Sequence, residues 1–164
     1  MLYENEKKVY EILNNLQIPY TKYEHKAIFT IEEANKLNID IKGQHCKNLF
    51  LRNRKGDKQY LLIIQEWKKV DVKSIAKQIQ SSSLSFASEE RLYKYLGLTP
   101  GSVTPFGLIN DSEKQVQVLL DKDLEEQNSI SFHPNVNTAT ITISYVDFKE
   151  FLKWCGNNVE YVQV

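Results

Sequence analysis

The residues from Gly97 to Gly107 form the segment of this sequence that is best suited to contact a ligand through its backbone. They read GLTPGSVTPFG and hold three of the chain's six glycines and two of its four prolines. Gly101 lets bare backbone N–H groups approach a ligand, and Pro105 fixes the exit of the turn. Such a loop can hold a carboxylate-like oxygen or a phosphate. Gly/Pro clusters are also ordinary turns, so other segments must decide between the two interpretations.

Lys47 is a second candidate, because the other side chains on its strand face are apolar. In the run HCKNLFL, from residue 45 to residue 51, strict alternation puts Lys47, Leu49 and Leu51 on one face. A lysine that points from such a face into a cleft is a partly desolvated cation, which could position a phosphate or polarise a carbonyl. A lysine at a strand edge with its ammonium group in water fits the same pattern.

Thiol and metal chemistry are disfavoured by the spacing. His45 and Cys46 are neighbours in a strand, so their side chains point to opposite faces and cannot form an acid–base pair. We therefore expect Cys46 to be a small core residue. The three histidines, at positions 25, 45 and 133, lack the spacing of a zinc site, and the sequence has no Cys-x-x-Cys pair. No metal and no other cofactor is expected.

A polar run, HPNVNT, extends from His133 to Thr138. Between two strands such a run is usually a turn. It is also a suitable rim for a small polar ligand, because amides such as that of Asn135 can recognise an ammonium or hydroxyl group with defined geometry.

The charges are unevenly distributed, although the formal net charge is zero. Between Lys42 and Lys77 there are ten Lys or Arg residues and three acids, whereas between Asp111 and Glu126 there are six acids and two lysines. An anionic partner that docks on one side of the protein would suit this asymmetry. A solvated lysine-rich surface would also produce it.

Length and composition are those of one globular domain. The chain has 164 residues, of which 41% are hydrophobic and 26% charged, and no apolar run approaches the ~18 residues of a membrane span. We expect a single domain over residues 1–164 and no membrane partner. The first residues lack the basic-then-apolar order of a signal peptide, and there are two cysteines, so a cytoplasmic location is expected.

Helices and strands that alternate along the chain are predicted to position these residues. Apolar spacing and capping residues predict helices over residues 3–16, 30–37, 71–79, 88–97 and 144–156. Strands are expected near residues 20–25, 46–53, 59–66, 115–120, 129–133 and 138–143, with a hairpin turn at residues 55–57. This pattern fits an α+β or mixed α/β fold.

Four segments together resemble the YbaK/ProX-type aminoacyl-tRNA editing domains. They are KNLFL from Lys47, LSFA from Leu84, GSVTPFG from Gly101 and FHPNVNT from Phe132. Their order and spacing match that family along nearly the whole chain. The sequence departs from the family at Cys46, where a Ser or Thr is expected, but this residue faces away from Lys47.

The resemblance implies a free-standing hydrolase that removes a wrongly attached amino acid from tRNA, built on a barrel-like mixed β-sheet flanked by helices. It implies catalytic roles for Lys47 and Gly101, without a cofactor. Substrate contacts are implied for Asn48, Ser102, Val103, Thr104, Pro105, His133 and Asn135. Contacts to tRNA are implied for Arg52, Arg54 and Lys55. The implied partners are tRNA, in particular mischarged proline tRNA, and prolyl-tRNA synthetase as a further candidate.

The HPNVNT run is similar to the corresponding segment of the ProX or PrdX branch, which clears alanine from proline tRNA. In the cysteine-specific branch we would instead expect a small Ser/Gly-rich turn here. A synthetase pocket for proline cannot exclude alanine by size, since each missing methylene gives only ~1–3 kcal/mol of discrimination. Ala-tRNA(Pro) is therefore the expected substrate, with water as the nucleophile. A Cys-tRNA(Pro) deacylase, a noncatalytic tRNA-binding module and a metal-assisted esterase stay open as alternatives.

Overall fold

In a computed structural model of the chain, which describes residues 2–27, 32–33 and 41–164, eight strands form one sheet. The strands are β1 (Thr21–Glu24), β2 (Gln44–Arg52), β3 (Gln59–Gln65), β4 (Ser85–Phe86), β5 (Val116–Asp121), β6 (Ser129–Phe132), β7 (Ala139–Ser144) and β8 (Val159–Val162). The α-helices are α1 (Leu2–Asn15), α3 (Val72–Gln78), α4 (Glu89–Leu96) and α5 (Tyr145–Cys155). Two 3-10 helices are η1 (Pro105–Asn110) and η2 (Lys122–Glu126).

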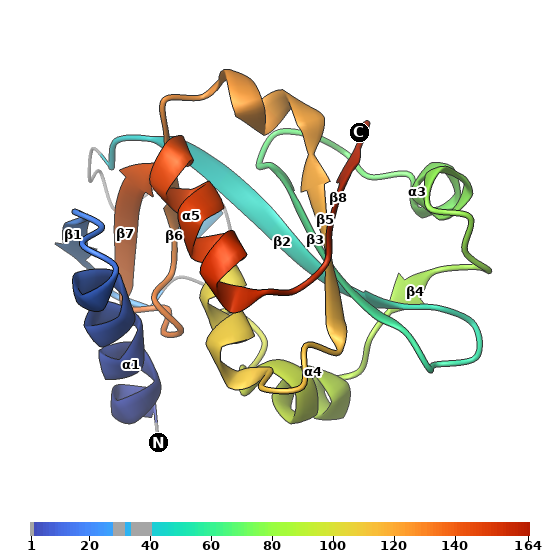
Figure 1. Ribbon diagram of the computed structural model, residues 1–164, viewed down its shortest axis with the longest axis horizontal. Coiled ribbons are helices and arrows are strands. Elements are labelled where there is room, and N and C mark those ends of the chain that lie inside the picture. The colour runs from blue at the N-terminus through green and yellow to red at the C-terminus, as the bar shows by residue number, and fades with distance from the viewer. Residues whose placement is uncertain (1, 28–31, 34–40) are drawn as a thin grey trace.

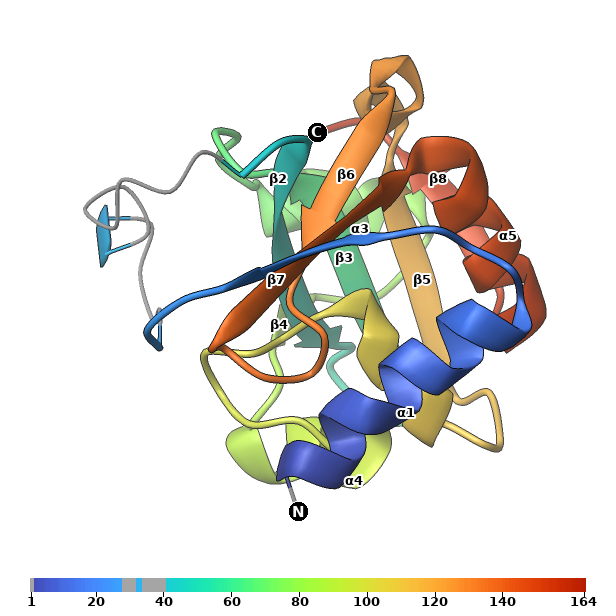
Figure 2. The ribbon, with the colours of Figure 1, turned by 90° about the vertical axis from the view of Figure 1, so that its left-hand side faces the viewer.

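The sheet is mixed, and β2 stands near its middle. The strand order is β1-β7-β6-β2-β3-β5-β8, and β4 pairs with β2. β2 is antiparallel to β3 and β4 but parallel to β6, while β5 is parallel to both of its neighbours. Figure 2 shows β7 crossing in front of β3, so the sheet curves strongly between its two ends. The predicted mixed, barrel-like sheet with flanking helices is confirmed.

β3 separates two hydrophobic clusters, because both of its faces are buried. Leu61 and Ile63 belong to the larger cluster, over which α1, α4, α5 and η1 pack. Tyr60, Leu62 and Ile64 belong to the smaller cluster, which α3 covers. A continuous apolar run is typical of a strand that is covered on both sides. Figure 1 shows α5 in front of the strands, with α1 and α3 at opposite ends of the view.

Most of the predicted elements are confirmed, with ends that differ by one or two residues. The hairpin turn is confirmed too, with Gly56 at a φ of +79°. The two-residue strand β4, the C-terminal strand β8 and the two 3-10 helices are absent from the sequence-based expectation. The helix expected over residues 30–37 lies outside the described residues, apart from residues 32 and 33, which are helical. Among the described helices, none is long and apolar enough to span a membrane.

Candidate active site

One edge of β2 is open over its middle. β2 pairs with β6 through its first two residues and with β4 through its last two. Within the described ranges, no strand pairs with this edge over residues 46–49, which include Lys47 and Asn48. At residue 50 the carbonyl oxygen accepts from the backbone N–H of Ala87 at 2.9 Å. The polar groups of an unpaired strand edge are available to a loop or a ligand.

The 101–105 loop meets this edge through Asn48. Its Nδ2 atom donates a hydrogen bond of 3.2 Å to the carbonyl oxygen of Val103, whose side chain packs against the larger cluster. The Oδ1 atom of Asn48 is buried and accepts no hydrogen bond from the part of the chain that the structure describes. Leaving a buried acceptor unpaired costs about 1–3 kcal/mol. Asn48 therefore keeps one unpaired, buried acceptor where β2 meets the 101–105 loop.

The loop is held on both sides of Val103. On one side, both the backbone N–H and the hydroxyl of Ser102 donate to the carbonyl oxygen of Thr99, at 3.2 Å each. On the other side, the Thr104 hydroxyl accepts from the backbone N–H at the start of η1, and Pro105 occupies the first turn of that helix. These three side chains are buried, so they fix the shape of the loop.

Backbone N–H groups remain available at the centre of this loop. Gly101 has a φ of +91°, a left-handed conformation that glycine adopts without steric cost. Among the described residues, the N–H groups of Gly101 and Val103 have no hydrogen-bond partner. Two N–H groups on a rigid loop can stabilise an oxygen that becomes negatively charged.

His133 presents a neutral imidazole next to the open edge. Its Nδ1 atom donates to the carbonyl oxygen of Ala139 at 2.8 Å, so Nε2 is left as an acceptor. Burial lowers the pKa of His133 below its ordinary value, and the nearby His25 and His45 act in the same direction, against the bond to Ala139. The parallel register aligns His45 of β2 with Ser131 of β6, and His133 lies two residues beyond this last paired position.

Lys47 and Asn48 leave β2 in opposite directions, as strand neighbours do. The Lys47 ammonium donates to the carbonyl oxygen of Lys68 at 2.5 Å. Lys68 is itself fixed by Asp121 and Asp123, whose carboxylate oxygens lie 2.9 Å and 2.6 Å from its Nζ atom. The structure therefore brings Asn48 to the 101–105 loop and places the Lys47 ammonium on the Lys68 carbonyl.

Asn135 joins the HPNVNT run to two other elements. Its Nδ2 atom donates to Oδ1 of Asn5 at 3.1 Å and to the carbonyl oxygen of Phe106 at 3.5 Å. The side chain is 1% exposed, and these contacts tie the run to α1 and to η1. Asn135 thus has a packing role in this structure, and a direct contact with substrate stays a prediction.

His25, which the sequence analysis considers only as a metal ligand, lies beside His133 with 6.0 Å between the ring centroids. Its Nε2 atom is 2.8 Å from the Thr140 hydroxyl. Across the described residues, no three His, Cys, Asp or Glu side chains form a group that could hold a metal ion. Burial raises the pKa of the Cys46 thiol well above its ordinary value, which keeps the sulfur protonated and a poor nucleophile.

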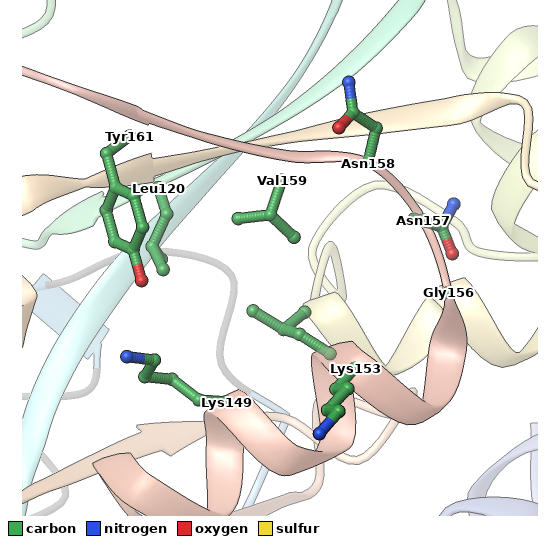
Figure 3. A pocket seen from close by; sticks show the side chains of 9 residues that line it. Leu120, Lys149, Lys153, Gly156, Asn157, Asn158, Val159 and Tyr161 are labelled. Carbon is green, nitrogen blue, oxygen red and sulfur yellow. The ribbon is translucent and has the colours of Figure 1, made fainter.

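The predicted tRNA contacts lie at the far end of β2. Arg54 and Lys55 are exposed at the tip of the β2–β3 hairpin, and Arg52 is half-buried at its base. A separate open pocket of about 520 Å³ lies between α5 and β8 (Figure 3). Lys149, Lys153 and Tyr161 line it, and no predicted site residue does.

These features agree with a comparison against protein families. The family model of the aminoacyl-tRNA editing domain matches residues 25–151, which contain the open edge of β2, the 101–105 loop and the HPNVNT run. The chain belongs to this family. It is 43% identical over 152 residues to the prolyl-tRNA editing protein ProX of Acetoanaerobium sticklandii, a match that covers 93% of each chain. It is 33% identical over 150 residues to the mouse prolyl-tRNA synthetase associated domain-containing protein 1, covering 89% of this chain and 88% of the mouse protein.

Solved structures share the fold. The hypothetical protein APE2540 superposes with a TM-score of 0.71 and 18% identity, over 93% of this chain and 96% of that one. A provisionally assigned trans-editing enzyme for prolyl tRNA synthetase superposes with a TM-score of 0.67 and 20% identity, over 98% of this chain and 97% of that one.

Proposed function

We propose that this protein is a trans-editing hydrolase that deacylates mischarged tRNA in the cytoplasm, with Ala-tRNA(Pro) as its main substrate and residues 1–164 acting as one editing domain. Membership of the editing family and the 43% identity with ProX support this activity. The observation that carries the proposal is the hydrogen bond between Asn48 and the Val103 carbonyl. It fixes the 101–105 loop at the open edge of β2, where the loop can face an ester.

The reaction needs a water molecule and an oxyanion site, and no protein nucleophile. Water adds to the carbonyl carbon of the aminoacyl ester, and negative charge develops on the carbonyl oxygen. The N–H groups of Gly101 and Val103 stabilise this oxygen, and removing one such donor typically lowers kcat by about 10²–10³. The tetrahedral intermediate then collapses, the ester bond to the terminal ribose breaks, and the ribose oxygen takes the proton that the attacking water loses.

The substrate is positioned by an acceptor and by a cation. Nε2 of His133 is the acceptor for the alanine ammonium. Lys47 exchanges the Lys68 carbonyl for the tRNA 3′ end or for the ester oxygen when substrate binds. Such positioning can supply much of the rate enhancement in a reaction of an activated ester.

Rigid walls support selection for a small side chain. Pro105 and Phe106 are buried in η1, and Pro134 is buried in the HPNVNT run. Fitting a pyrrolidine ring into a site packed for a methyl group costs about 1–3 kcal/mol in strain and also displaces the ester. Ala-tRNA(Pro) is then cleaved, and correctly charged Pro-tRNA(Pro) survives. Arg52, Arg54 and Lys55 contact the tRNA backbone, and prolyl-tRNA synthetase is the partner that supplies the mischarged tRNA.

The experiment that tests this proposal is the release of alanine from Ala-tRNA(Pro) by the purified protein. Release well above the spontaneous rate is expected, and it should persist in the presence of a strong chelator. Tight binding of tRNA without release would indicate a noncatalytic module, and release that the chelator abolishes would indicate a metal-assisted esterase.

A further inference from the structure

We propose that the base of the β2–β3 hairpin, together with β4 and α4, binds the unpaired 3′ strand of the tRNA. In this proposal, which rests on the proposed function, Arg52 and Arg91 bind a phosphate and the Phe86 ring stacks on a base. We call this set of residues the hairpin surface; it consists of Arg52, Arg54, Lys55, Lys58, Phe86 and Arg91. Figure 1 shows β4 beside the hairpin and α4 at the same end of the molecule.

Two guanidinium groups are fixed on either side of Gly56. Arg91 donates from Nη1 to the carbonyl oxygen of Gly56 at 2.9 Å, and Arg52 donates from Nη2 to the carbonyl oxygen of Arg54 at 3.0 Å. A carbon atom in the Cβ position of Gly56 would lie 2.8 Å from Nη2 of Arg91 and 3.4 Å from Nη2 of Arg52. The Nη2 atoms of Arg91 and Arg52 are therefore separated by no more than the sum of these last two distances. One phosphate can accept from two guanidinium groups at this separation, at about 2.7–2.9 Å each.

The guanidinium groups of Arg52 and Arg91 have no carboxylate partner among the described residues, whereas Lys55 and Lys58 interact with the nearby Asp57 carboxylate. Backbone carbonyls orient the guanidinium groups but carry no net charge. The ion pairs that the structure shows among the described residues involve other cations. The nearby Asp57 carboxylate accepts from the Asn53 amide at 2.7 Å. Fixed cations without carboxylate partners favour an anionic ligand, and phosphate suits the fork geometry of arginine.

An exposed aromatic ring selects a single strand over a duplex. Phe86 is 63% exposed, although it lies in a strand and pairs with the buried Leu51. The neighbouring pair joins Ser85 to Arg52, and strand neighbours point to opposite faces, so the Phe86 ring and the Arg52 side chain lie on opposite faces of the edge that β4 forms. A single strand that crosses this edge can place a phosphate on the guanidinium pair and stack a base on the ring, as single-strand sites do with cations and aromatic platforms. The stacked bases of a duplex would leave this ring without a partner.

The distance to the open edge of β2 fits the unpaired end of a tRNA. Arg52 lies four residues beyond Asn48 along β2, which is about 13 Å at ~3.3 Å per residue. Stacked nucleotides rise by ~3.4 Å each, so about four of them span this distance. The unpaired 3′ end of a tRNA has this length. An unpaired end whose phosphate is held at Arg52 is therefore long enough to bring its terminal ribose to the 101–105 loop.

The test compares the binding of two RNAs, an uncharged proline tRNA and the same tRNA without its unpaired 3′ nucleotides. Two variants remove one element each, Arg91→Gln and Phe86→Ala. Lys153→Gln and Trp154→Ala on α5 are matched controls, because they remove one exposed cation and one exposed ring elsewhere. Phe86→Tyr tests rescue, since it keeps the ring.

We expect Arg91→Gln and Phe86→Ala each to weaken binding of the intact tRNA at least fivefold. Binding of the truncated tRNA should stay within twofold of wild type in both variants. Phe86→Tyr should bind the intact tRNA as wild type does. Wild-type affinity for both RNAs, or equal losses on both, would overturn the proposal. Failure of the proposed function would give a different result. In that case the wild-type protein would not release alanine from Ala-tRNA(Pro), whatever RNA the variants bind.

Discussion

Asn48 and Val103 are joined by a single side-chain hydrogen bond of 3.2 Å, although they stand 55 residues apart in the chain. This bond connects the strand that carries Lys47 to the loop that carries Gly101. Its acceptor is a backbone carbonyl, so the bond orients the peptide unit itself. The N–H groups of Gly101 and Val103, which precede this carbonyl in the loop, are then held relative to β2, which is what an oxyanion site requires.

Replacing Asn48 by Ala should release the loop. We expect kcat/KM for Ala-tRNA(Pro) to fall at least tenfold, equivalent to ~1.4 kcal/mol in the barrier. Asn48→Asp is the informative companion, because it keeps the acceptor but loses the N–H donor to Val103. If Asn48→Asp is as active as wild type, the anchoring bond has no role in catalysis.

Lys47→Ala should also lower deacylation at least tenfold, or by ~1.4 kcal/mol in the barrier, without unfolding the protein. The reason is that Lys47 is a half-buried cation beside the open edge, with one carbonyl as its partner. Lys69→Ala, which removes an exposed lysine from the adjoining turn, is the matched control. Thermal unfolding of both variants should stay close to wild type. Near wild-type turnover in Lys47→Ala would remove this lysine from the mechanism.

Gly101→Ala should abolish most of the turnover, because a side chain at a φ of +91° costs roughly 1–2 kcal/mol and shifts the loop N–H groups. Gly156→Ala carries similar backbone strain, at a φ of +78°, but caps the end of α5. Both variants should lose similar stability in denaturant unfolding. If both also keep similar activity, the 101–105 loop is only a turn.

The acid limb of the pH profile should reflect His133. Burial lowers the pKa of this histidine in the folded protein below its ordinary value of 6.5, so the unfolded state binds more protons between the two values. The stabilisation from neutral His133 is therefore complete above about pH 6.5 and is lost as the pH falls toward the lowered pKa. Protonation also removes the Nε2 acceptor, so kcat/KM should fall with a midpoint below 6.5.

His133→Gln checks this assignment, because its side-chain oxygen accepts hydrogen bonds but does not titrate. The variant should turn over more slowly than wild type, with a flat profile between pH 5 and 7. An unchanged acid limb in His133→Gln would assign the titration to another group.

The sequence predicts the parts of this fold that repeat a pattern. The helix ended by Gly156 and the strand YLLII are set by apolar spacing over many residues, and both are confirmed. β4 could not be predicted, because two residues show no periodicity and Phe86 is exposed. It exists because Ser85 and Phe86 pair with the end of β2.

The site was predictable in its segments but not in its contacts. Glycine and proline chemistry marks the 101–105 loop, and alternation marks the face of Lys47. The partners of Lys47, Asn48 and Asn135 are distant in sequence, namely the carbonyls of Lys68, Val103 and Phe106 and the side chain of Asn5. Two of these side chains were expected to contact substrate, and each turns out to hold the protein's own backbone. Only tertiary packing decides such contacts.

The proposal that this protein deacylates Ala-tRNA(Pro) is tested most directly by one comparison. It compares kcat/KM for Ala-tRNA(Pro), Cys-tRNA(Pro) and Pro-tRNA(Pro) in one assay with one enzyme preparation. We predict the fastest release from Ala-tRNA(Pro), weak release from Cys-tRNA(Pro), whose side chain adds one sulfur, and survival of Pro-tRNA(Pro). Faster cleavage of Cys-tRNA(Pro) than of Ala-tRNA(Pro) would contradict the assignment to alanine, and no release above the spontaneous rate from any of the three would contradict the hydrolase itself.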